Sequence, residues 1–238
     1  MKKAGIISVA ALFLLSAVGC ASSGKAIIGQ KDPIALVSVV SNREINWKDE
    51  APTDSNTFLI YGNRTRQEDP DMTLTSYADE FINTAETLFR KAIDSTNLIS
   101  LADKETVLSS SAYREAKTND PARNTLVKPA EYRFINYRDK EFPAAMVNAT
   151  GIQRVMFVEF DFTKSMYSGF GKNGECRAEV DMIIRIMDSR GKTLYNNKFS
   201  SLSRSTIRVS WAVYSHTGLL ELFESAINYA CRDFLDSL

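Results

Sequence analysis

The fold is decided by residues 177–200, which read RAEVDMIIRIMDSRGKTLYNNKFS. Polar and apolar residues alternate from Arg177 to Met187, as they do in a strand that buries one face. The turn sequence Asp188-Ser189-Arg190-Gly191 is typical of a hairpin. Lys192–Ser200 continues as the partner strand. We therefore predict an antiparallel hairpin late in the chain.

A further strand precedes this hairpin, because Gln153–Thr163 (QRVMFVEFDFT) is rich in aromatic and β-branched residues. Successive residues of a strand point to opposite faces of the sheet. One face of this strand is uniformly apolar, which is typical of a core contact, and it holds Met156, Val158, Phe160 and Phe162. The other face holds Phe157, Glu159 and Asp161.

Hydrophobic periodicity places the remaining elements. Helices are predicted over Ser76–Asp94, Asp103–Lys117, Pro143–Ala149 and Thr217–Leu235. Short strands are predicted over Ile34–Val40, Phe58–Tyr61, Asn97–Leu101 and, with a connection as the alternative, Ile207–Val213. This order favours an α/β (α+β) fold, in which a mixed sheet with a late antiparallel hairpin is packed by helices and closed by a C-terminal helix. Residues 34–238 have the length of a single domain.

The first 19 residues have the features of a secretory signal peptide. Lys2 and Lys3 precede an apolar run from Ile6 to Leu15, and small residues lead to Cys20. The apolar run is too short to span a membrane, which takes about 20 residues. Residues 20–33 then form a tether, whose last 13 residues reach at most about 43 Å when fully extended.

The run Leu15-Ser16-Ala17-Val18-Gly19-Cys20 resembles the lipobox of bacterial lipoproteins, although Ala17 stands where leucine is usual. This resemblance implies that Cys20 is acylated, palmitate included, and that the lipid holds the chain on a membrane. Ala21 and Ser22 follow the cysteine in place of aspartate. In the family this implies the outer membrane, and we expect the domain on its periplasmic face.

The path of elements from ALVSVV through LISLADKE to MIIRIMDSRGKTLYNNKFS is similar to a group of envelope domains. The group comprises the curli-secretion lipoprotein CsgG, the N-terminal domain of TolB and the lipoprotein LpoB. The resemblance implies a binding or assembly module, not an enzyme, that engages an envelope protein or self-associates. The chain has 29 basic and 29 acidic residues, so no overall charge attracts nucleic acid.

Three patterns could suggest chemistry, and none predicts a catalytic residue, a metal or a cofactor. Gly169–Gly174 matches G-x-G-x-x-G, but a strand and not a helix follows, so we expect a turn. His216 is the only histidine and cannot build a multi-histidine metal site. Glu159 and Asp161 share one strand face, which favours a solvated surface over a cation site or an acid–base pair.

Aromatic residues supply the candidate binding site, which consists of Trp47, Phe157, Phe160 and Phe162. Each ring could belong to the core or to a lipid or peptide groove. The predicted function is an outer-membrane-anchored, non-enzymatic binding or assembly module. The alternative is a lipoprotein that carries a lipid or small molecule in an aromatic-lined pocket. A large closed pocket would favour the carrier, whereas a filled core would favour the binding module.

Cys176 and Cys231 are predicted to remain free thiols. Cys176 lies at the end of the hairpin away from its turn, and the final helix starts near that end. Cys231 is 14 residues beyond Thr217, which is about 21 Å along a helix, whereas a disulfide needs Cα atoms within about 7 Å. An oxidising compartment and an even cysteine count favour a bridge instead.

Overall fold

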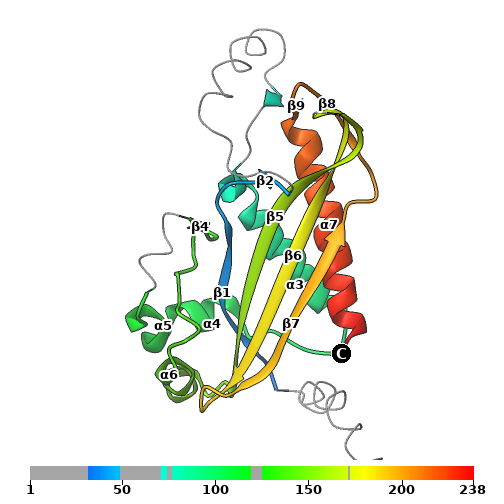
Figure 1. The fold of residues 1–238 in the computed structure, drawn as a ribbon. Coiled ribbons are helices and arrows are strands. Elements are labelled where there is room, and N and C mark those ends of the chain that lie inside the picture. Colours follow the sequence, from blue (N-terminus) through cyan, green and yellow to red (C-terminus); the bar gives the residue numbers. More distant parts are fainter. Residues whose placement is uncertain (1–31, 49–70, 74–76, 119–124, 171) are drawn as a thin grey trace, which may run out of the picture.

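The computed structural model describes residues 32–48, 71–73, 77–118, 125–170 and 172–238 (Figure 1). These residues form a mixed sheet of nine strands that is packed by helices and closed by a C-terminal helix. The predicted α+β class is confirmed. The predicted signal peptide, Cys20 and most of the predicted tether lie outside the described residues.

Two long antiparallel strands, β5 (Arg154–Phe170) and β6 (Asn173–Asp188), form the spine of the sheet and pair along their whole length. Strand β7 (Thr193–Leu202) pairs with β6 and completes the predicted hairpin. Its turn is held by Asp188, whose carboxylate accepts hydrogen bonds from the amides of Arg190 and Lys192, both at 2.9 Å. Strand β1 (Ala35–Asn42) lies parallel to β5 on the other side.

Short strands extend the sheet at its margins. Strands β8 (Ile207–Ser210) and β9 (Val213–Ser215) form a hairpin in place of the single strand predicted over 207–213. Trp211 and Ala212 between them have positive φ angles of 52° and 66°, which reverse the chain. The other pairings are β3 (Met72–Thr73) with β9, β2 (Asn46–Trp47) with β5, and β4 (Leu126–Val127) with β1.

One face of the sheet is covered by α3 (Ile82–Asp94) and α7 (His216–Asp236), which lie side by side behind the strands in Figure 1. The side chain of Ser215 caps α7 by accepting from the amide of Gly218 at 2.9 Å. The main hydrophobic core lies between these helices and the sheet, and includes Phe81, Phe89, Phe160, Phe162, Phe223 and Phe234.

The opposite face is covered only in part. Helices α4 (Lys104–Ser109), α5 (Ser111–Glu115) and α6 (Glu141–Thr150) pack over the beginnings of β1 and β5. A second core lies beneath them and includes Val37, Tyr113, Phe142, Met146, Val155 and Phe157. These helices are gathered on one side of the molecule, so no helix of the described residues lies over the middle of β5, β6 and β7 on this face (Figure 1).

Three further predicted elements differ from the structure. Residues 97–101 form no strand, since their only ladder contact is a single bridge from Leu101 to Ile34. The predicted helix over 103–117 is broken at Ser110, whose hydroxyl caps the short helix that follows. Helix α3 begins at Ile82 and not at residue 76, after the 3-10 turn η1 (Ala78–Glu80). The predicted strand over 58–61 lies outside the described residues.

Within the described residues, no helix is both long enough and apolar enough to cross a bilayer.

Candidate functional site

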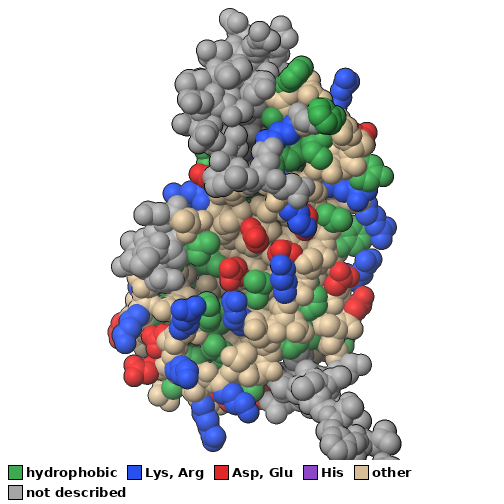
Figure 2. All heavy atoms as spheres, in the orientation of Figure 1, with side chains coloured by type: hydrophobic (Ala, Val, Ile, Leu, Met, Phe, Trp, Pro, Cys, Tyr) green, Lys and Arg blue, Asp and Glu red, His purple; other side chains and the backbone are tan. Residues whose placement is uncertain are grey.

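The uncovered part of the sheet carries a lattice of paired charges, which we call the charged strand face. Its residues alternate along three neighbouring strands, and they are Glu159, Asp161, Glu179, Asp181, Arg185 and Lys198. Figure 2 shows this face, on which acidic and basic side chains lie close together in the middle of the molecule. The predicted solvated strand face is therefore present, but its charges form specific pairs.

Ion pairs link the strands across this face. Arg185 donates from Nη1 to Oε2 of Glu159 at 3.1 Å, which joins β6 to β5. The Nζ of Lys198 lies 2.6 Å from Oδ2 of Asp181, which joins β7 to β6. Lys48 binds Glu179 from the segment that follows β2. Each pair joins a side chain that is largely withdrawn from solvent, such as Arg185 at 18% exposed, to a more exposed partner. The pairs therefore hold these charges in fixed positions on the face.

Two aspartates face each other at the centre of the lattice, since Asp161 and Asp181 are direct partners in the β5–β6 register. Loss of solvent between the strands and repulsion from Asp181 raise the pKa of Asp161, although the residue as a whole is exposed. Burial acts in the same direction on Asp181, but hydrogen bonds from Lys198 and Ser200 outweigh it and lower the pKa of that carboxyl. Of these two aspartates, Asp181 is thus well paired and Asp161 is not.

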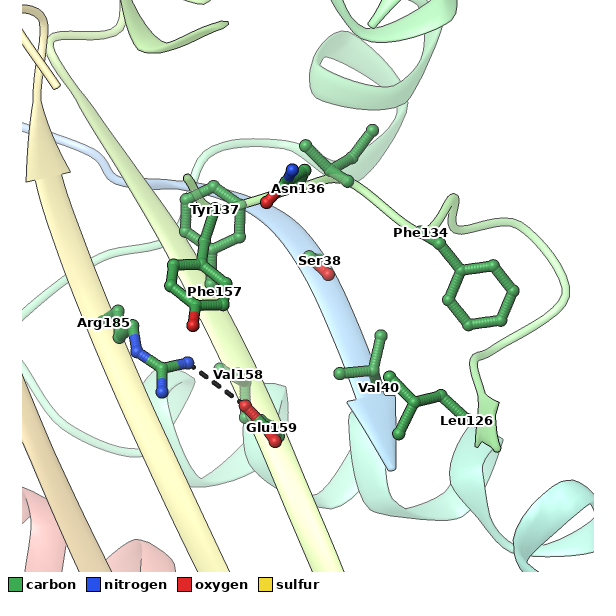
Figure 3. Close-up of a pocket in the computed structure, with 11 residues that line it drawn as sticks. Ser38, Val40, Leu126, Phe134, Asn136, Tyr137, Phe157, Val158, Glu159 and Arg185 are labelled. Atoms are coloured by element: carbon green, nitrogen blue, oxygen red, sulfur yellow. Dashed lines mark hydrogen bonds and ion pairs between the residues drawn. The ribbon is translucent and has the colours of Figure 1, made fainter. Parts of the chain in front are cut away.

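An aromatic hollow adjoins the charged strand face, with a cavity volume of about 210 Å³. It lies between the sheet and the segment 126–137, and Figure 3 shows Tyr137, Phe157 and Arg185 along one side of it. The guanidinium of Arg185 stacks 4.3 Å from the centre of the Tyr137 ring. The rest of the lining includes Ser38, Val40, Leu126, Phe134, Asn136 and Glu159.

The structure separates the four predicted binding aromatics. Phe160 and Phe162 are buried in the main core, where their rings stack on each other and Phe162 packs edge-to-face against Phe81 and Phe223. Phe157 is on the other face; it packs against Tyr137 and Phe142 and borders the hollow.

Trp47 packs against the edge of the main core that holds Phe160 and Phe162. It is half-buried, with the buried ammonium group of Lys164 5.4 Å from its ring centre. The Nζ of Lys164 also donates to the hydroxyl of Tyr214 at 2.8 Å. Whether any of the four predicted aromatics binds a ligand remains a prediction, and only Phe157 borders the hollow.

The glycines of the Gly169–Gly174 motif allow the ends of β5 and β6 to pair closely. Gly169 and Gly174 are paired residues of β5 and β6 with φ angles of 105° and 144°. A Cβ on Gly169 would lie 1.9 Å from the carbonyl oxygen of Asn173. Glycine is therefore required where the paired backbones of β5 and β6 approach closely, and the motif joins two strands as predicted. Gly171 lies outside the described residues.

His216 and the cysteines show no arrangement for chemistry. His216 is the first residue of α7, and its Nε2 lies 2.9 Å from the carboxylate of Glu80 in η1. Within the described residues, no group of three or more histidine, cysteine or acidic side chains could hold a metal ion. Cys176 and Cys231 are buried free thiols, as predicted. Cys176 pairs with Ile207 of β8, so the chain does return to that end of the sheet before α7 begins.

Of the residues that line the hollow, the predicted binding site included only Phe157, and the two that matter most among those it missed are Tyr137 and Arg185. Arg185 stood out only as a polar residue in an alternating strand. The available signal was its register, because an arginine beside an acidic strand finds partners there. Tyr137 lies in a segment without regular structure, and nothing local indicated that it would reach β5.

No family model matches the chain, and no curated protein matches it. Among solved structures, the LpoB C-terminal domain from Salmonella enterica matches with 9% identity and a TM-score of 0.29, over 72% of this chain and 84% of that one. The lipoprotein GNA1162 from Neisseria meningitidis matches with 17% identity and a TM-score of 0.34, over 84% of this chain and 99% of that one. Scores this low fix neither fold nor function, so the conclusions below rest on the chain's own residues.

Proposed function

We propose that this chain is an outer-membrane lipoprotein, anchored through acylated Cys20, whose domain binds an envelope protein without catalysing a reaction. The observation that carries the binding role is the charged strand face beside the aromatic hollow. A sheet face that is not covered by helices, and that presents fixed charges of both signs, offers complementary contacts to a partner. The lipobox-like run 15–20 supports the anchor.

The shape of the hollow favours a binding module over a carrier. Sites that enclose a drug-sized ligand have volumes of about 300–1,000 Å³, and this hollow has about 210 Å³. It is large enough to receive one or two side chains of a partner. Arg185 stands at its rim between Tyr137 and Glu159, where it can hold a partner carboxylate while the rings contact apolar atoms.

The anchor is tested by labelling cells with radioactive palmitate. The natural chain should be labelled and processed, whereas Cys20→Ala should give an unlabelled precursor. Cys176→Ala is the matched control and should label normally, because that thiol is buried. Persistent N-terminal label on the Cys20→Ala chain would show that Cys20 is not the site of acylation.

The binding face is tested by photo-crosslinking in the intact envelope. A photoreactive residue in place of exposed Asp161 should capture a specific protein, whereas one in place of exposed Glu221 on α7 should not. Arg185→Glu should abolish the crosslink at 161, because the rim charge is reversed. Arg232→Glu on α7 is the matched control, since that side chain is 55% exposed and distant from the hollow. Equal capture at both positions would reject this face as the binding surface.

A further inference from the structure

The end of the sheet farthest from the start of β1 displays large apolar side chains, which we call the aromatic tip. It consists of Tyr167, Phe170 and Trp211, which are 55%, 92% and 63% exposed. Hydrophobic side chains gather at this end of the molecule, around the β8–β9 hairpin (Figures 1 and 2). Exposed Phe and Trp side chains together at one point of a surface indicate a contact with something apolar.

Hydrogen bonds hold the parts of the tip together. The amide of Ala212 donates to the carbonyl of Lys172 at 3.0 Å, and the amide of Trp211 donates to the side chain of Asn173 at 2.7 Å. These bonds tie the β8–β9 turn to the end of the β5–β6 ribbon. Lys172, Trp211 and Ala212 all have positive φ, which is uncommon for residues other than glycine. Two neighbouring parts of the chain, at Lys172 and at Trp211–Ala212, thus adopt unusual backbone conformations and are hydrogen-bonded to each other.

The surroundings of the tip are basic. Residues 164–178 and 206–214 contain three basic residues that reach the surface, Lys172, Arg177 and Arg208, and one acidic residue, Glu175, which is the register partner of Arg208. The fourth basic residue of these ranges, Lys164, is buried. The chain as a whole has no net charge, so this end differs from the rest. Arg177 lies 3.7 Å from the centre of the Tyr167 ring, and Arg208 is exposed beside the β8–β9 turn. An apolar point with cationic side chains beside it complements a surface with apolar depth and anionic headgroups.

The size of the tip favours a lipid surface over a protein partner. At about 150–250 Å² per aromatic side chain, the three exposed fractions amount to roughly 400 Å². A stable protein interface takes about 800 Å² from each partner. Insertion of a few aromatic side chains among headgroups needs no such area, because each ring that leaves water contributes separately.

The direction of the tip indicates which end of the domain meets that surface. Ala35 pairs with Val155, so the chain enters the sheet beside the start of β5. Phe170 lies 15 residues farther along β5, which is about 50 Å at 3.3 Å per residue. The tip and the entry of the chain are therefore at opposite ends of the sheet.

We infer that the aromatic tip inserts into the headgroup region of an anionic lipid bilayer, with Phe170 and Trp211 as the inserting residues and Arg208 as a headgroup contact. This contact is separate from the acyl anchor and from the charged strand face. It would let the domain touch lipid at the end opposite to its tether.

The test uses residues 20–238 with Cys20→Ser, so that no acyl chain contributes; both hydrophobic cores lie within this span. The chain is sedimented with vesicles of phosphatidylethanolamine and phosphatidylglycerol, and with vesicles of phosphatidylcholine alone. Binding to the anionic vesicles is expected, with a blue shift of tryptophan emission that Trp211→Phe removes. Phe170→Ala should weaken the partition about tenfold, and Arg208→Gln about fivefold, the latter only on anionic vesicles.

Leu98→Ala is the matched control, because Leu98 is 50% exposed and lies close to Leu101, which bridges to Ile34 at the opposite end of the sheet. It should bind vesicles as the parent chain does. Absence of binding to anionic vesicles would overturn the inference, and so would binding that Phe170→Ala leaves unchanged. Capture of a protein, without lipid, by a photoreactive residue at position 170 in the intact envelope would also overturn it.

Discussion

Substitution by alanine should destabilise the domain strongly at one phenylalanine of β5 and hardly at all at another. Phe162 is 0% exposed, with the ring centres of Phe223, Phe81 and Phe160 at 5.1, 5.4 and 5.7 Å. Phe162→Ala removes the ring and leaves a cavity that these neighbours cannot close, which costs about 4 kcal/mol. Phe170 is 92% exposed, so Phe170→Ala should change the free energy of unfolding by less than about 0.5 kcal/mol.

Urea unfolding of the two variants measures the contrast. A domain has about 5–15 kcal/mol of stability in total, so a loss of about 4 kcal/mol is a large part of it. With a slope of about 2 kcal/mol per molar urea, the midpoint of Phe162→Ala should fall by roughly 2 M, and its Tm by roughly 10 °C. A fall of less than about 1 kcal/mol at Phe162, or a larger one at Phe170, would refute the assignment of Phe162 to the core and of Phe170 to the surface.

Three further predictions follow from buried or bonded polar groups. Glu86→Gln should lower the free energy of unfolding by about 3 kcal/mol, because Glu86 is 5% exposed and is the countercharge of Arg90. Hydrogen bonds from the start of α7 lower the pKa of Asp71 from 3.8 to about 2, so its contribution to stability should be present above pH 4 and be lost as the pH falls toward 2. The stability difference between the natural chain and Asp71→Asn, measured by unfolding at each pH, should shrink over that range. Burial raises the pKa of Cys176 to about 11 and that of Cys231 to about 12, so mass spectrometry should find both alkylated by iodoacetamide only after unfolding.

Each of these has a specific contrary result. Glu105→Gln, at an exposed position of α4, should be nearly neutral, and equal losses for both glutamates would show that the Glu86 network is unimportant. A difference between the natural chain and Asp71→Asn that is constant with pH would remove the Asp71 cap. A peptide that links the two cysteines in the unreduced chain would show that they meet.

Hydrophobic periodicity predicted the elements that bury one whole face. The strand over 153–163, the 177–200 hairpin and the helix over 217–235 were all found, because each reads as an uninterrupted pattern of core residues. Met156, Val158, Phe160 and Phe162 could be placed in one core from alternation alone, and all four are buried.

Element ends and breaks depended on contacts that local sequence does not reveal. The helix predicted over 103–117 breaks at Ser110, which caps α5 by accepting from the amide of Tyr113. Serine is acceptable inside a helix and favourable at its cap, so the pattern alone did not decide. The strand predicted to end at Thr163 continues to Phe170, through a glycine that ordinarily weakens a strand. Glycine is tolerated here because its pairing with Gly174 brings the two backbones close together, and this pairing depends on the partner strand β6.

Each candidate surface contains a residue that departs from the polarity of its neighbours in the sequence. Phe157 is an aromatic residue on an otherwise acidic strand face, and the structure places it at the border between the second core and the hollow. Phe170 stands within a glycine-rich run, where the sequence predicted only a turn. The sequence could not predict which residues contact one another. Arg185 contacts Tyr137 only because of the β5–β6 register and the path of the 126–137 segment.

The charged strand face and the aromatic tip belong to one ribbon, yet their functions should be separable. Arg185 is the register partner of Phe157, and Phe170 lies 13 residues farther along β5, which is about 43 Å away. Effects at sites more than about 10 Å apart that share no contacts are additive. Arg185→Glu should therefore abolish crosslinking at position 161 without changing vesicle binding, and Phe170→Ala should do the reverse. The double variant should show both losses at their single-variant size. A vesicle-binding defect in Arg185→Glu would mean that the ribbon transmits a change between the two surfaces, and the two would then have to be treated as one site.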